Sequence, residues 1–285
     1  RFVTDNRILA NGLLGLGLEY GDQKIRWTNV YIRDVLKQSS LSNGTIIVGS
    51  GDDGFDKIIQ ETGWFERQLI DSQVGGEFVF GDIGLDLRAG YAQTDRESPF
   101  EYRFDYVRTN NPNQPFGEFF INPLDNNLPG GQASVAFSDL TEKVYYSGGD
   151  LTVPLTDSFS LTGGLAYTDT QRESARRFFQ FSAPSNFPNG IALLRPDLLI
   201  TPTIIEASNV PGFAAPGVAA PIDLRELTED TPAFSADLEV LAGYLKGNLS
   251  LLNGLTIDAG VRYEDAEQVV SPLQVFTNQP NLGAF

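Results

Sequence analysis

The sequence contains neither cysteine nor histidine. Without cysteine, the chain can form no disulfide, no thiolate metal site and no thiol nucleophile. Without histidine, it loses the commonest general base and the commonest transition-metal ligand, and Ser-His-Asp and Cys-His arrangements are excluded. We therefore expect a protein that is not an enzyme, with no catalytic residues and no cofactor.

Long apolar runs are also missing. No stretch approaches the roughly 18 continuous apolar residues of a membrane-spanning helix, so a helical membrane protein is excluded. The mean hydropathy of −0.15 is compatible with a membrane β-barrel, because barrel strands alternate apolar and polar residues. The chain begins at Arg1 without a hydrophobic signal sequence, so we expect a mature or internal piece of a protein.

Basic residues are scarce. The chain has 20 Lys and Arg against 37 Asp and Glu, a net charge of −17 that repels nucleic-acid phosphates, and we expect no nucleic-acid partner. Three of the acids lie close together in a glycine-rich segment and present carboxylates that suit Ca²⁺, although their spacing is not that of an EF-hand: Asp52, Asp53 and Asp56. A solvated acidic loop is the alternative.

Three segments alternate strictly between apolar or small residues and polar ones: residues 83–91, 159–167 and 255–263. Period-two alternation predicts strands with one apolar face and one polar face. Each segment follows a short turn, at Gly81-Asp82, Thr156-Asp157 or Asn253-Gly254, and an earlier turn lies at Gly21-Asp22. Such pairs between alternating runs predict β-hairpins.

The opposite ends of these hairpins are joined by long polar segments, at residues 39–57, 109–138 and 182–231, with a polar tail after Ser271. Short turns on one edge and long loops on the other are typical of an outer-membrane barrel. We therefore predict an all-β fold, an antiparallel transmembrane barrel wall of about eight strands in four hairpins, with short periplasmic turns and long extracellular loops. A soluble β-sandwich is the alternative.

The ends of the predicted strands carry aromatic residues, which we expect to form two rows at the membrane interfaces: Tyr20, Phe80 and Phe159 near the short turns, and Tyr91, Tyr167 and Tyr263 at the opposite limit. Charged residues at the alternate positions would face the barrel lumen: Asp86, Arg88, Asp258 and Arg262. We expect these four to pair with one another or with a plug, and not to contact the ligand.

Residues 241–264, LAGYLKGNLSLLNGLTIDAGVRYE, resemble a recurrent barrel segment of TonB-dependent outer-membrane receptors, and residues 64–99 resemble earlier hairpins of that family. The resemblance implies a barrel of about 22 strands with an N-terminal plug. It implies active import of an iron–siderophore complex, cobalamin or an oligosaccharide across the Gram-negative outer membrane. Its implied partners are the outer-membrane lipid and lipopolysaccharide, and an inner-membrane energy-coupling complex that would act through parts outside this chain. No plug domain or coupling motif is identifiable, so we expect residues 1–285 to be an internal part of the barrel domain.

Arginine suits carboxylate and phosphate groups, and aromatic rings offer stacking faces. We therefore expect ligand contacts from the residues that lead into the longest loop and from a second aromatic group: Arg172, Arg176, Arg177, Phe178 and Phe179, with Phe119 and Phe120. Lipopolysaccharide contact and loop packing are the alternatives for these residues. For the whole protein, the alternatives to an importer are a passive porin-like or structural barrel and a secreted or soluble β-rich adhesion domain.

Overall fold

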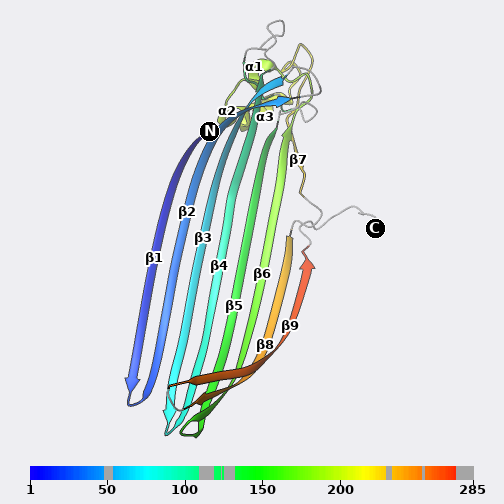
Figure 1. The fold of residues 1–285 in the computed structure, drawn as a ribbon. Helices are drawn as coiled ribbons and strands as arrows, with labels where there is room; N and C mark the ends of the chain where they lie inside the picture. The colour runs from blue at the N-terminus through cyan, green and yellow to red at the C-terminus, as the bar shows by residue number, and fades with distance from the viewer. Residues whose placement is uncertain are drawn as a thin grey trace, which may run out of the picture.

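The computed structural model describes residues 1–47, 54–108, 119–122, 124, 132–228, 233–251 and 254–273. In these ranges the chain forms long strands and three short helices (Figure 1). The strands are β1 Phe2–Tyr20, β2 Gln23–Ile47, β3 Gly54–Phe80, β4 Ile83–Arg108, β5 Ala133–Thr156, β6 Phe159–Ser182, β7 Asp223–Glu226, β8 Ala233–Ser250 and β9 Thr256–Pro272. The helices are α1 Asn189–Ala192, α2 Pro196–Leu199 and α3 Pro202–Ser208.

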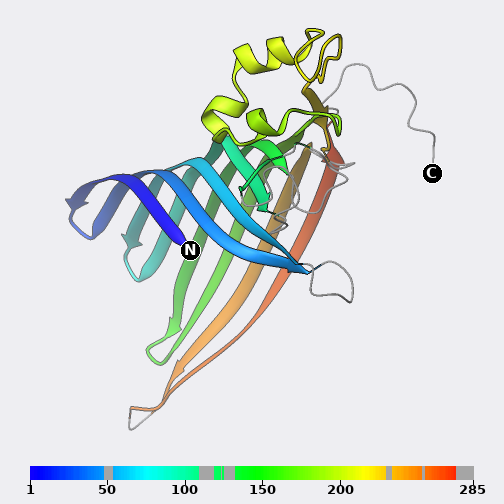
Figure 2. The same ribbon diagram turned by 90° about the horizontal axis from the view of Figure 1, so that it is seen from above.

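All strands belong to one antiparallel sheet in the order β1-β2-β3-β4-β5-β6-β8-β9. The short β7 pairs with the upper end of β6, beyond the part of β6 that pairs with β8. The sheet curves but is open, with β1 and β9 at its two edges (Figure 2). The predicted all-β architecture of four consecutive antiparallel hairpins is confirmed.

The hairpins β1–β2 and β3–β4 turn through two residues, Gly21-Asp22 and Gly81-Asp82. Gly21 has φ 60° and Gly81 has φ 68°, a backbone conformation that glycine adopts without steric cost. Glycine at the first turn position matches the tight turns whose twist fits antiparallel strands. These turns, with the β5–β6 turn at residues 157–158, lie together at the lower end of the sheet in Figure 1.

The upper parts of the strands differ from the sequence-based expectation. Residues 39–47, 54–57 and 133–138 were expected in loops, but they continue β2, β3 and β5. Polar composition resembles that of a loop, yet each of these residues is paired with a neighbouring strand. β3, with 27 residues, is therefore roughly 90 Å long.

The pairing register divides the sheet into two chemically different faces. In the lower half, one row of directly paired residues runs Leu18, Ile25, Gly76, Leu87, Gly149, Leu165, Gly243 and Tyr263. The next row runs Gly17, Arg26, Gly75, Arg88, Gly148, Ala166, Ala242 and Glu264. Neighbouring residues of a strand point to opposite faces, so the first row belongs to what we name the apolar face and the second to the polar face.

A bulge in β4 changes which of its residues lie on each face. The register shifts on both sides of this strand, between Trp64 and Glu66 opposite β3 and between Ser98 and Glu101 opposite β5. Both shifts are explained by one extra residue in β4 near Pro99. Proline has no backbone N–H to donate to the hydrogen bonds between strands. The Ser98 hydroxyl donates a hydrogen bond to the Trp64 carbonyl at 3.0 Å. Above the bulge, the even-numbered residues of β4 lie on the apolar face.

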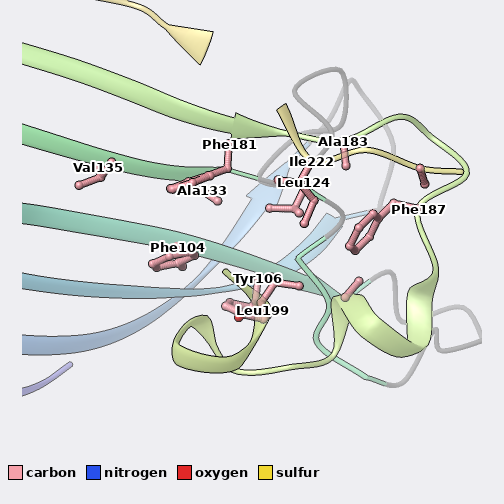
Figure 3. Packing of buried hydrophobic residues seen from close by; sticks show 12 residues of the cluster. Phe104, Tyr106, Leu124, Ala133, Val135, Phe181, Ala183, Phe187, Leu199 and Ile222 are labelled. Atoms are coloured by element: carbon pink, nitrogen blue, oxygen red, sulfur yellow. The ribbon is translucent and has the colours of Figure 1, made fainter. Parts of the chain in front are cut away.

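The buried core lies at the upper end of the sheet. Residues 183–222, which we name the helical insert, contain α1, α2 and α3 and pack beside the strand ends (Figure 2). Figure 3 shows Phe104, Val135 and Phe181 of the sheet in one cluster with Phe187 and Leu199 of the insert. β5 keeps its register from Ala133 to Pro154, so Val135 lies on the same face as Leu151. The insert therefore covers the upper extension of the apolar face.

Tyr106 anchors this insert. Its hydroxyl donates a hydrogen bond to the Leu194 carbonyl at 2.6 Å, and its burial raises the pKa of the phenol well above the usual value. Leu199 is 0% exposed, so the second helix is fixed through its side chain. Among the helices in the described part of the chain, none combines the length and the apolar character needed to cross a membrane as a helix.

Candidate functional site

A cavity of about 300 Å³ lies on the polar face near the upper end of β2 to β6. We name it the polar-face cavity. Its lining comes from five neighbouring strands and includes Ser40 of β2, Glu61 and Phe65 of β3, Glu101 and Arg103 of β4, Ser134 of β5, and Arg176 and Phe178 of β6. The β4 bulge is what turns the odd-numbered Glu101 and Arg103 toward this face.

The charged groups of the cavity are paired within its walls. Arg103 lies 3.1 Å from Glu61 and 3.1 Å from the buried Asp105, which also pairs with Lys57. Arg176 reaches across β5 and lies 3.3 Å from Glu101. Ser40 donates a hydrogen bond to Glu61 at 3.2 Å. The lining therefore presents fixed donors and acceptors, with two arginines balancing two glutamates.

Two phenylalanines, Phe65 and Phe178, belong to the apolar part of the lining. The Phe65 ring lies against Gly63, where an added Cβ would be 2.7 Å from the Phe65 Cε2 atom. The absence of a side chain at Gly63 therefore leaves the space that this ring occupies. The backbone of Phe178 is held by the segment after β7, since its N–H donates to Thr228 Oγ1 at 3.1 Å and its carbonyl accepts from the Leu227 N–H at 2.8 Å.

The structure divides the five predicted ligand residues of β6 between the two faces. Arg176 and Phe178 line the polar-face cavity, and Arg172 lies below it on the same face, where its Nε donates to Glu142 at 2.6 Å. Arg177 and Phe179 point to the opposite face and contact each other, with the guanidinium 4.9 Å from the ring centroid. A single ligand site cannot include all five.

Arg177 instead fixes β7 to the sheet. Its Nε and Nη2 each donate to the Glu226 carboxylate at 3.0 Å. These hydrogen bonds lower the pKa of Glu226 below its usual value. The predicted aromatic pair Phe119 and Phe120 lies elsewhere, with Phe119 exposed and Phe120 packed against the core and under Arg108 at 4.8 Å.

Of the three predicted metal ligands, Asp52 and Asp53 lie outside the described residues. Asp56 pairs with Arg108 and accepts a hydrogen bond from Thr45 Oγ1 at 3.3 Å. Within the described ranges no cluster of acidic side chains has the arrangement of a metal site. A calcium role for the three aspartates stays a prediction.

The four predicted lumen residues Asp86, Arg88, Asp258 and Arg262 all lie on the polar face. None of the four pairs with another of them in this structure, and their pairing with a plug stays a prediction. Arg88 pairs with Asp150, Asp258 lies 3.1 Å from Lys246, and Arg262 lies 2.6 Å from Glu264. These partners belong to the same strand or to an adjacent one, so Arg88, Asp258 and Arg262 are each neutralised locally.

The six aromatic residues predicted for the membrane interfaces all lie on the apolar face. Tyr20 and Phe80 are exposed at the lower end. By the pairing register, the row of Tyr91 meets β6 at Asp169 and the row of Tyr263 meets it at Leu165, with Tyr167 between them. Tyr91 contacts Tyr145 with ring centroids 5.0 Å apart. Their contact with membrane interfaces stays a prediction.

Four cavity residues were not predicted from the sequence: Glu61, Phe65, Glu101 and Arg103. Local alternation assigns faces within a strand, but it does not reveal which residues of other strands lie alongside. One feature of the sequence, Ser98-Pro99, indicates that the faces of β4 change, because a proline within a strand marks a bulge.

No protein-family model matches this sequence, and no curated protein is similar to it. Among solved structures, the fold is similar to that of the ferric citrate transporter FecA in its unliganded form, with a TM-score of 0.34 and 10% identity over 94% of this chain and 39% of that chain. It is also similar to the siderophore receptor PiuA from Acinetobacter baumannii, with a TM-score of 0.26 and 9% identity over 96% of this chain and 44% of that chain. The chain thus spans less than half the length of these two proteins.

Proposed function

We propose that this chain is part of the barrel wall of a TonB-dependent outer-membrane receptor that takes up a scarce ligand such as an iron–siderophore complex, cobalamin or an oligosaccharide. The observation that carries the proposal is the division of one continuous sheet into an apolar face and a polar face. A wall with lipid on one side and an aqueous lumen on the other requires this division.

The dimensions of the apolar face support a membrane position. From Phe159 to Tyr167 the strand rises roughly 26 Å, and a tilt near 40° reduces this to about 20 Å, close to the apolar band of outer-membrane barrels. Exposed apolar side chains fill the interval, and Leu165 and Val261 are 68% and 75% exposed. A soluble protein rarely exposes so large a contiguous apolar surface.

The open edges support the view that the wall contains further strands. Among the described strands, β1 and β9 each have a neighbour on one side only. In a bilayer each backbone N–H and C=O group on the other side would lack a hydrogen-bond partner, which costs several kcal/mol per group. The proposed barrel therefore includes strands beside both edges, and an inner-membrane complex would supply energy through other parts of the protein.

The test compares cells with and without the gene, each given ferric citrate, cobalamin or a neutral oligosaccharide as the limiting nutrient. We expect the gene to be needed for accumulation of one of these, and a protonophore to abolish that accumulation. Single-channel recording of the purified protein should show no steady large pore. A steady pore with accumulation that a protonophore leaves unchanged would establish the passive barrel instead.

A further inference from the structure

Resting on the proposed function, we propose that the polar-face cavity binds an uncharged, polyhydroxylated ligand, a neutral oligosaccharide, in preference to an anionic metal chelate. The cavity lies on the face assigned to the lumen, above the apolar band, where an incoming ligand meets the wall before it passes the membrane. Its volume of about 300 Å³ is at the lower limit for small-molecule sites, which suits the end of an oligosaccharide.

The electrostatics of the cavity disfavour an anion. Both arginines already hold carboxylates of the wall, Arg103 with Glu61 at 3.1 Å and Arg176 with Glu101 at 3.3 Å. An anionic ligand would have to displace these carboxylates, which would then lose their partners, or approach them with like charge. An uncharged ligand meets neither penalty.

The same groups suit hydroxyls. A guanidinium has five N–H donors, and a carboxylate has about four acceptor positions, so each pair retains free donors and acceptors. The Arg176 side chain is 57% exposed and Glu101 is 24% exposed, so both remain accessible to a ligand. A sugar hydroxyl both donates and accepts hydrogen bonds. The neighbouring arginine donors and glutamate acceptors of the cavity therefore match a hydroxyl better than they match a carboxylate, which only accepts.

The aromatic lining completes the match. Phe65 and Phe178 lie on the same face as the ion pairs and are half-buried. One side of a sugar ring carries C–H groups, which can pack on an aromatic ring while the hydroxyls at its rim reach the charged pairs. Gly63 gives Phe65 its position, so this ring is held by the wall and not by the ligand.

The test titrates the purified protein in detergent with neutral hexasaccharides of glucose, xylose and N-acetylglucosamine, each alone, and with ferric citrate, using calorimetry. We expect at least one hexasaccharide to bind and ferric citrate not to bind. Phe178→Ala should weaken hexasaccharide binding about tenfold, because it removes the stacking surface. Phe137→Ala is the matched control, since Phe137 is exposed on the opposite face and should leave the affinity unchanged.

Glu101→Gln separates the two ligand classes. It removes one negative charge and weakens the hold on Arg176 but retains an acceptor, so hexasaccharide binding should change less than about threefold. Any binding of ferric citrate that appears should appear in this variant and not in the native protein, and binding of ferric citrate to the native protein would overturn the inference. Failure of all three hexasaccharides to bind, or equal effects of the Phe178 and Phe137 substitutions, would also overturn it.

These outcomes are distinct from a failure of the proposed function. Calorimetry measures binding alone, whereas uptake and conductance measure transport. Hexasaccharide binding in a protein that forms a steady passive pore would keep the inference and reject the receptor. Energy-dependent uptake of ferric citrate or cobalamin, with no hexasaccharide binding, would keep the receptor and reject the inference.

Discussion

Gly164 leaves the space in which two side chains of the polar face meet. The Tyr244 hydroxyl donates to Asp150 at 2.7 Å, directly over this glycine. A Cβ at Gly164 would lie 2.1 Å from Asp150 Oδ1 and 2.2 Å from Tyr244 Cε1. We expect Gly164→Ala to lower the unfolding free energy by about 1 to 3 kcal/mol, because a packed site is overfilled.

Urea unfolding of the detergent-solubilised protein measures this effect. Gly15→Ala is the control, since Gly15 lies on the same face with no atom within 4 Å of its added Cβ. Its unfolding midpoint should not fall. Equal unfolding midpoints for the two variants would show that the contact between Tyr244 and Asp150 does not depend on the space left at Gly164.

Glu226 makes the attachment of β7 depend on pH. Hydrogen bonds from Arg177 lower its pKa in the folded protein, so the pair contributes stability above the usual pKa of about 4.3. That contribution is lost as the pH falls through the lowered pKa. We expect β7 amides to exchange faster at about pH 3 than at about pH 6, after correction for intrinsic rates.

Glu226→Gln is the reference variant for this measurement, because its amide does not titrate. Its corrected exchange in β7 should be similar at the two pH values. If the native protein and the variant show the same pH dependence, another group must control the attachment of β7.

At the residue scale, Arg176, Arg177, Phe178 and Phe179 were all expected to contact the ligand. The period of two in a strand sends neighbouring residues to opposite faces, and this period was not applied to them. The sequence could not predict that Arg103 stands opposite Glu61, because that pairing depends on the register between strands. Charged pairs across strands are properties of two segments together.

At the element scale, the bulge near Pro99 determines the composition of both faces above it. It turns Phe104 and Tyr106 toward the helical insert and Glu101 and Arg103 toward the polar-face cavity. Deleting Pro99 removes the extra residue and reverses these directions. We expect the insert to lose burial of Phe104, a loss worth about 3 to 5 kcal/mol for a phenylalanine.

Limited proteolysis of residues 183–222 measures the release of the insert, and the deletion should make these residues much more sensitive. Pro99→Ala keeps the number of residues in β4 and serves as the control, with sensitivity close to that of the native protein. A deletion variant with native sensitivity would show that the bulge does not determine the register.

The upper strand segments show why the sequence underestimated strand length. Residues 39–47 carry serine, asparagine and glycine, which are common in loops. They remain strands because β3 offers a partner for each of them. The helical insert was not predicted because its helices have only four to seven residues, too few for a helical period to be recognised.

At the scale of the whole molecule, the two faces predict opposite responses to charge at adjacent positions. Leu165 lies on the apolar face and Ala166 on the polar face. In the proposed membrane position, Leu165→Arg should destabilise the inserted barrel by about 2 to 4 kcal/mol, the cost of arginine at mid-bilayer on the lipid side.

Ala166→Arg is the matched control and should be much less harmful, because the lumen is aqueous. The fraction of inserted protein in isolated outer membranes is measured by its heat-modifiable migration on a gel. If both substitutions reduce that fraction equally, the apolar face does not contact lipid, and a soluble sheet becomes the better description.

The order of the strands also carries information about folding kinetics. Six of the seven pairings along the main sheet join strands that follow each other in the chain, so short loops close first. The pairing of β6 with β8 closes the segment from Ala175 to Ala233, and loop-closure entropy rises by about 0.6 kcal/mol for each doubling of loop length. β7, which follows the helical insert, pairs with Phe179–Ser182 of β6, so the chain has already returned to β6 before β8 begins. With β7 in place, we expect the loop that remains to be closed to be the short segment from Glu226 to Ala233, at a lower entropic cost.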